Sequence, residues 1–139
     1  MQKPVMITIL VLILIVAGAL FYGFVFERTG ISVEEISIDS EKVKHPVRIV
    51  HISDLHIYRL SSFENKIVQK VNSLRPDIIA VTGDLFLKRE IWENTGHDFE
   101  TTLAHVSKFM ETLQAKDAVY LCHGNNDISN DMEKSALLL

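Results

Sequence analysis

The sequence predicts an α/β fold with a parallel βαβαβ order, preceded by a transmembrane helix. Three short apolar runs, 47–53, 78–82 and 118–122, are typical of strands. The first fits a strand that is buried on both faces, and the second also fits a buried strand. The segments between them carry apolar residues at spacings of three and four, as in helices that lie on a sheet. Strand, helix and strand in this order predict right-handed units with parallel strands.

The first predicted element is an uncharged stretch of 22 residues, Val5–Phe26. At about 1.5 Å per residue its helix would be about 33 Å long, enough to cross a bilayer core of about 30 Å. A cleaved signal peptide is the alternative, but its apolar region spans only about 7–15 residues. Aromatic residues near the end of this stretch also make a poor cleavage site. We therefore expect an uncleaved anchor within residues 1–28.

The anchor is expected to hold the protein in a membrane as a single-pass protein through residues 4–26. Lys3 and the amino terminus flank one end of the helix, and Arg28 flanks the other beside an acidic residue. Lysine and arginine decide orientation more than acidic residues do. This balance favours an internal N-terminus and an extracytoplasmic soluble part.

The next segment, residues 29–46, is expected to be a juxtamembrane connection. Ile36 and Ile38 flank Ser37, and this alternation predicts a short edge strand. Residues 47–139 then form the predicted soluble domain. Its helical segments are identified by two apolar stripes, at 63, 67, 71 and 74 and at 99, 103, 106, 110 and 113.

The charge of the soluble part excludes one class of partner. Residues 1–26 hold one of the 14 lysines and arginines and none of the 18 acidic residues, so the remainder has 13 basic and 18 acidic side chains and a formal charge of −5. A nonspecific nucleic-acid binder needs basic surface, so we expect no nucleic-acid binding. The sequence also lacks the glycine-rich motifs of nucleotide-binding α/β domains.

A polar motif follows each predicted strand. The three motifs are Asp54-Leu55-His56, Gly83-Asp84 and Gly124-Asn125-Asn126-Asp127. Because the carboxyl ends of parallel strands meet at one edge of a sheet, the three loops are expected to converge. Residues two apart in an extended chain point to the same side, so Asp54 and His56 offer a carboxylate and an imidazole to a divalent metal. Ordinary turn and helix-cap chemistry is the alternative for each motif.

The ordered motifs resemble the signature of the calcineurin-like metallophosphoesterases, which is D-x-H, then G-D, then G-N-H-D or G-N-H-E. The match covers about Val47 to Asp127, and the apolar anchor is similar to that of membrane-attached members. The resemblance implies the N-terminal half of a metallophosphoesterase α/β sandwich. It also implies hydrolysis of phosphate monoesters or diesters by a hydroxide shared between two divalent metals. Mn, Fe or Zn suit such nitrogen and oxygen ligands better than Ca does.

The resemblance also implies a role for each motif residue. Asp54 and His56 would bind the first metal, Asp84 would bridge both metals, and Asn125 would bind the second through its amide oxygen. The alternative for Asn125 is a turn, because Gly-Asn-Asn-Asp is good turn chemistry in its own right.

Three further residues belong to the expected catalytic group. Asn126 stands where the family has the histidine that protonates the leaving oxygen, and an asparagine donates hydrogen bonds but gives up no proton at neutral pH. We therefore expect substrates with good leaving groups. Asp127 is expected to orient its neighbours. His123 is a candidate for the missing acid, with a structural role as the alternative.

The family's later histidine ligands, a lone histidine and a G-H-x-H motif, have no counterpart here, because none of the 12 residues after Asp127 is a histidine. The sequence thus predicts a domain truncated at the C-terminus, whose missing ligands come from a further segment or a partner chain. The alternative is a catalytically inactive, membrane-anchored half-domain, either a binding module or a gene remnant. Such a half-domain would leave one sheet face uncovered and would be poorly soluble.

Overall fold

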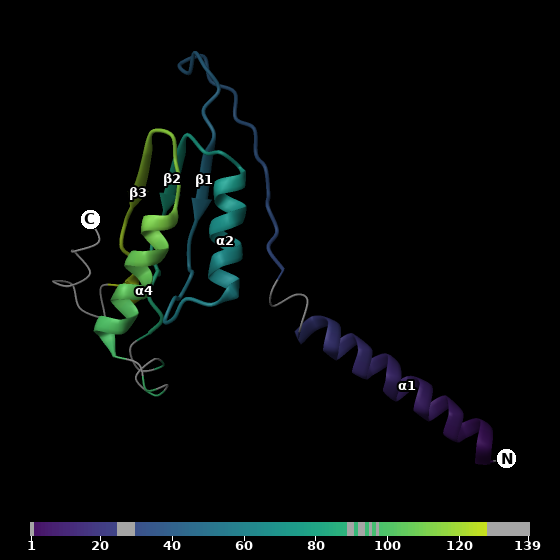
Figure 1. Ribbon diagram of the computed structural model, residues 1–139. Coiled ribbons are helices and arrows are strands. Elements are labelled where there is room, and N and C mark those ends of the chain that lie inside the picture. Colours follow the sequence, from purple (N-terminus) through teal and green to yellow (C-terminus); the bar gives the residue numbers. More distant parts are fainter. Residues whose placement is uncertain are drawn as a thin grey trace. The chain divides into compact units, whose positions relative to one another are not determined.

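The structure is a computed structural model that describes residues 2–24, 30–88, 91, 94, 96 and 98–127 (Figure 1). The chain divides into two compact units, Met1–Ile38 and Asp39–Leu139. The end of the predicted anchor, at 25–28, and the last 12 residues of the predicted domain lie outside the described residues.

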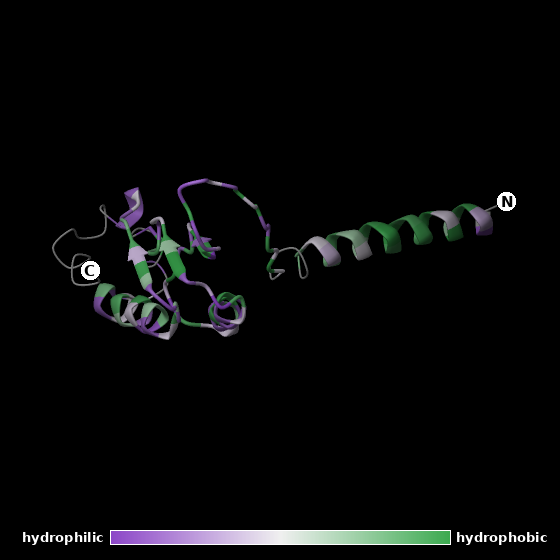
Figure 2. Ribbon diagram, turned by 90° about the horizontal axis from the view of Figure 1, so that it is seen from above, coloured by the Kyte–Doolittle hydropathy of each residue, from purple (hydrophilic) through white to green (hydrophobic). Residues whose placement is uncertain are grey.

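The first unit is built on one helix, α1 (Gln2–Tyr22). Its segment Lys3–Tyr22 is long and apolar enough to cross a membrane, and Figure 2 shows hydrophobic colouring along most of the helix. The hydroxyl of Thr8 donates to the carbonyl oxygen of Pro4 at 3.0 Å, so this polar group is satisfied inside the helix. That matters in hydrocarbon, where no water replaces a missing partner. The predicted apolar helix is therefore present.

The expected edge strand at Ile36 and Ile38 is wrong. The described residues 30–48 contain no strand, and the two side chains are 74% and 86% exposed. A strand is stabilised by a ladder of hydrogen bonds to a neighbour, and this segment pairs with none among the described residues. Alternation of apolar residues alone was not enough to form a strand.

The second unit contains a parallel sheet of three strands, β1 (Ile49–Ile52), β2 (Ile78–Val81) and β3 (Ala118–Leu121), in that order. The register is in step across the sheet, so that the last residues of the three strands lie side by side. The carboxyl ends are therefore flush, and the three following loops begin at the same edge. The predicted parallel βαβαβ order is confirmed.

Two helices cover one face of this sheet, α2 (Ser62–Ser73) and α4 (Phe99–Thr112) (Figures 1 and 2). Right-handed crossovers along the order β1-β2-β3 bring both helices to the same face. Ser61 begins α2 with a capping box. The Ser61 hydroxyl accepts a hydrogen bond from a backbone N–H in the first turn of the helix, and the Glu64 carboxylate accepts one from the Ser61 backbone N–H. Asp98 caps α4 by accepting the Thr101 N–H at 2.7 Å.

The core lies between the helices and the sheet. Ile79 and Val81 of β2 pack with Val71 of α2 and with Val106 and Phe109 of α4, and each of these side chains is at most 4% exposed. This packing follows from the two apolar stripes that the sequence contains. The helical faces are therefore fixed by hydrophobic burial rather than by contact between charged side chains.

The opposite face of the sheet is uncovered in the described chain. We call the residues on this side the open face: Ile49 and His51 of β1, Ile78 and Ala80 of β2, and Ala118 and Tyr120 of β3. The side chains of Ile49 and Tyr120 are 60% and 63% exposed. The expectation of a strand buried on both faces is therefore wrong for β1. A hydrogen bond of 2.6 Å joins His51 Nε2 to the Thr82 hydroxyl.

Candidate metal centre

The first two loops extend the sheet beyond its strands. The Asp54 N–H donates to the carbonyl oxygen of Gly83 at 3.1 Å, and the His56 N–H donates to that of Asp84 at 3.0 Å. Parallel pairing thus continues past β1 and β2, so that the D-x-H motif lies beside the G-D motif. The flush strand ends therefore position these loops as the sequence predicted.

Buried apolar residues directly after the two motifs attach both loops to the hydrophobic core. Ile57 and Phe86 pair as an isolated parallel bridge, and both are at most 1% exposed. Leu85 is equally buried, and the ring of Phe86 stacks on that of Phe99 of α4, with the centroids 5.7 Å apart. The polar residues of the loops therefore rest on the main hydrophobic core.

Three of the predicted ligands have a left-handed backbone. The φ angles of Asp54, His56 and Asp84 are 57°, 47° and 51°. The only other described non-glycine residue with a positive φ is Arg75. Such conformations are uncommon outside glycine and concentrate at functional sites, where the surrounding structure maintains them. The expected extended geometry of the D-x-H motif is therefore wrong, although its two side chains do converge.

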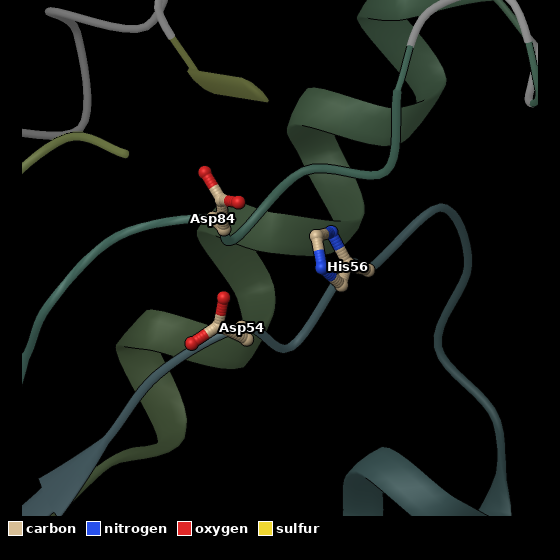
Figure 3. Close-up of side chains that lie close together, drawn as sticks. All are labelled: Asp54, His56 and Asp84. Atoms are coloured by element: carbon tan, nitrogen blue, oxygen red, sulfur yellow. The ribbon is translucent and has the colours of Figure 1, made fainter. Parts of the chain in front are cut away.

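The side chains of Asp54, His56 and Asp84 surround a common space (Figure 3). One potential ligand atom from each lies within 4.8 Å of the others. Two carboxylates and an imidazole are a donor set that suits a divalent transition metal. These three residues therefore fit the divalent metal that the sequence implies. No further histidine, cysteine or acidic residue joins this group in the described part of the chain.

Neighbouring groups fix the orientation of two of these side chains. The Ser53 hydroxyl donates to Asp54 Oδ2 at 2.5 Å. His56 Nδ1 lies 3.4 Å from the carbonyl oxygen of Phe86. When Nδ1 carries the proton and donates to this carbonyl, Nε2 presents a lone pair to a cation, the arrangement that is usual for metal-binding histidines.

The third loop is tied to the second through Asp84. The Asn126 backbone N–H donates to Asp84 Oδ1 at 3.0 Å, and the Asn126 side-chain Nδ2 donates to Asp84 Oδ2 at 2.7 Å. Asp127 makes a second link, because its carboxylate accepts from Phe86 at 3.0 Å and from Gly124 at 2.8 Å. Asn126 is 4% exposed and Asp127 1%. Both side chains are therefore buried where the second and third loops meet.

The other two predicted residues of the third loop lie elsewhere. Asn125 is exposed, and its Nδ2 lies 3.4 Å from the side-chain oxygen of Asn126. His123 is partly buried and does not join the group formed by Asp54, His56 and Asp84. The roles of Asn125 as a ligand and of His123 as an acid stay predictions.

A comparison with models of protein families shows which family this chain belongs to. The model of the calcineurin-like phosphoesterases matches residues 47–138. The chain belongs to this family. The resemblance drawn from the three motifs is therefore confirmed, and so is the α/β class of the domain.

Two curated relatives of this calcineurin-like phosphoesterase were found. They are the UDP-2,3-diacylglucosamine pyrophosphatases LpxG of Chlamydia trachomatis and Chlamydia muridarum, each 33% identical over 85 residues. The aligned region covers 60% of this chain and 23% of each relative. The chain thus spans less than a quarter of the length of the relatives that it matches. No solved structure matches it significantly.

The sequence analysis missed the role of the two motif glycines in this phosphoesterase. A Cβ atom on Gly83 would lie 2.4 Å from the backbone nitrogen of Gly124, and one on Gly124 would lie 2.1 Å from Asp84 Oδ1. Gly83 also has a φ of 94°. The second and third loops can approach this closely only without side chains at both positions. The signal in the sequence was the glycine at the start of both motifs.

Proposed function

We propose that this chain supplies the first group of ligands of a divalent-metal phosphoesterase. The observation that carries the proposal is the convergence of Asp54, His56 and Asp84, whose ligand atoms lie within 4.8 Å of one another at the carboxyl edge of the sheet. Family membership supports hydrolysis of phosphate esters as the reaction class.

The proposed site holds two metal ions, with Mn, Fe or Zn as the best candidates for these donors. When bound, the metals would supply Lewis acidity toward a phosphoryl oxygen and an activated water. Asp54 and His56 would hold the first ion, Asp84 would lie between the two, and Asn125 would offer its amide oxygen to the second. Asp127 would keep the second and third loops together.

These ligands do not complete two metal sites. A catalytic metal of this kind usually has about three protein ligands and an open position. We propose that the remaining ligands are histidines outside 47–127, on a further segment of the protein or on a partner chain.

The proposed substrate is a phosphoric anhydride or an activated diester. The two relatives are named as pyrophosphatases of UDP-2,3-diacylglucosamine. Cleavage of a pyrophosphate releases a phosphate group, which leaves without needing a proton from the enzyme. This suits a site in which Asn126 replaces the family's histidine, because an asparagine gives up no proton at neutral pH.

We also propose that α1 anchors the protein in a membrane, with the soluble part on the extracytoplasmic side. The length and apolar character of Lys3–Tyr22 support this. Extraction of membranes with alkaline carbonate should leave the protein in the pellet, and protease added to intact cells should cleave it. Release of the protein by carbonate would exclude the anchor, and protection from protease would reverse the orientation.

Hydrolysis by the full chain in detergent tests the proposal. Release of UMP from a UDP-linked sugar and of p-nitrophenol from bis(p-nitrophenyl) phosphate would be measured with Mn²⁺, with EDTA, and in Asp84→Asn. Mn²⁺-dependent release that EDTA and Asp84→Asn abolish supports the enzyme. Metal binding without hydrolysis, even with added partner protein, would favour the second candidate, a non-catalytic binding half-domain. Two observations favour that candidate. Asn126 stands where the family has a histidine, and the set of proposed metal ligands is incomplete.

A further inference from the structure

Asn126 is a buried polar side chain that faces a proposed ligand rather than the space where a substrate would lie. It is 4% exposed. Its backbone N–H and its side-chain amide donate to the two different carboxylate oxygens of Asp84, at 3.0 and 2.7 Å. One residue thus fixes both the position and the rotation of the Asp84 carboxylate.

The same side chain reaches the next proposed ligand. The carbonyl oxygen of Asn126 lies 3.4 Å from Nδ2 of Asn125. The opposite orientation of the Asn126 amide would place its oxygen against the Asp84 carboxylate, so that two acceptors would face each other. The contact with Asp84 therefore determines the orientation of Asn126. That orientation in turn attracts the Asn125 nitrogen and leaves the Asn125 oxygen as the atom to offer to a cation.

We propose that Asn126 is a positioning residue that holds Asp84 and Asn125 in the orientations needed for metal binding. The inference rests on the proposed metal site. It assigns to Asn126 a role that acts through Asp84, instead of direct donation to the leaving group. A buried amide that already donates to a carboxylate is poorly placed for that donation.

The hydrogen bonds are compatible with metal binding by Asp84. A carboxylate offers about four lone-pair directions, two on each oxygen. One hydrogen bond to each oxygen leaves a lone pair on both, which Asp84 would have available for a cation. Partners of this kind that orient ligands typically change metal affinity about 10–100-fold when they are removed.

Titration of the full chain with Mn²⁺ by calorimetry, in detergent, tests this role. Asn126→Ala and Asn126→Leu both remove the amide, and Asn126→Leu roughly preserves the side-chain volume, which guards against loss of folding. We expect the Mn²⁺ Kd to rise about 10–100-fold in both, with unchanged circular dichroism.

Asn72→Ala is the matched control. Asn72 also links two elements through its side chain, because it donates to Thr112 and accepts from Gln114, both at 2.9 Å. It belongs to the helical layer, and its side chain forms these two hydrogen bonds to α4 and the residue after its cap rather than to a proposed ligand, so its loss should lower stability without changing the Kd of the folded protein. This separates a positioning role from a purely structural one.

Three outcomes would overturn the inference, and they differ in what else they exclude. A Kd within about twofold of the wild type in the folded Asn126 variants would overturn the positioning role and leave the metal site standing. Absence of Mn²⁺ binding by the wild type would overturn the metal site and this inference with it. Asn126→His gives a further check, since hydrolysis that rises at an unchanged Kd would show direct donation to the leaving group instead.

Discussion

At the residue scale, Asp84 connects the second and third loops of the proposed site. Its backbone is left-handed, and its carboxylate receives two hydrogen bonds from Asn126. Gly124 lies so close that it has no room for a Cβ atom. The position of this carboxylate thus depends on the third loop as much as on its own.

Gly124→Ala should displace Asp84 or separate the two loops, because the new methyl group would lie 2.1 Å from Asp84 Oδ1. Such overpacking typically costs about 1–3 kcal/mol. We expect a lower free energy of unfolding in urea and weaker Mn²⁺ binding. Gly96→Ala is the control for a glycine with open space around it, although its φ of 78° also strains alanine. Unchanged stability and affinity in Gly124→Ala would show that the close approach is unimportant.

The residue types of the site were predictable, but their conformations were not. Asp54, His56 and Asp84 follow strand-like runs, so parallel pairing alone brings them to one edge. Their left-handed backbones depend on hydrogen bonds between loops that are distant in sequence. The inward orientation of Asn126 likewise follows from its contact with Asp84, 42 residues away. Local patterns carry no signal for such contacts.

At the element scale, the start of α2 offers a direct test of helix capping. Ser61 accepts from the Phe63 N–H at 3.1 Å, and Glu64 accepts from the Ser61 N–H at 2.7 Å. Ser61→Ala should lower the free energy of unfolding by about 1 kcal/mol, the usual value for loss of a cap. Urea denaturation measures this. A change below about 0.3 kcal/mol would mean that packing alone determines where α2 begins.

The opposite edge of the sheet contains a pH-sensitive contact. The backbone N–H of Arg48 donates to Asp77 at 2.7 Å, and this bond, with a smaller contribution from Lys116, holds the pKa of Asp77 below 3.8 despite the opposing effect of burial. Because the folded pKa is the lower one, the stabilisation is present above pH 3.8 and is lost as the pH falls through the folded pKa.

Asp77→Asn should therefore be less stable than the wild type at pH 7, and the difference should shrink on acidification. Urea unfolding of both proteins at pH 7 and at pH 3 measures it. Asp117→Asn, an exposed neighbour, controls for general charge effects. A difference between wild type and Asp77→Asn that does not vary with pH would contradict the assignment.

The elements that formed as predicted are those with both a local pattern and a packing partner. The stripes of α2 and α4 meet the buried face of β2. The two helices were predicted from apolar spacing, and β2 was predicted from an unbroken apolar run. The alternation at Ile36 and Ile38 has no neighbouring strand in the part of the chain that the structure describes, and it forms no strand. Burial on both faces was expected for β1 because a run such as Ile49–Ile52 does not reveal which layers are present.

At the scale of the whole molecule, the open face is the largest departure from a closed domain. Ile49 and Tyr120 are more than half exposed, and the outer strands of the sheet pair with no further strand among the described residues. Ile49→Thr combined with Tyr120→Thr should reduce self-association of the chain in detergent, because both changes keep strand propensity and remove apolar surface. Sedimentation velocity would measure the association.

Val47→Thr is the matched control for this test. Val47 is 49% exposed and precedes the sheet, so its replacement should leave association unchanged. Equal association of the double variant and the wild type would show that the open face contributes nothing to it.

The central claim is that Asp54, His56 and Asp84 form a metal site, and the most direct test is Mn²⁺ binding by the full chain and by Asp84→Asn, measured by calorimetry. Asp117→Asn serves as the control at an exposed aspartate. The account predicts that the wild type and Asp117→Asn bind Mn²⁺ equally, and that Asp84→Asn binds at least about tenfold more weakly, because a neutral amide replaces a carboxylate ligand. Equal binding by Asp84→Asn, or no binding by the wild type, would contradict it.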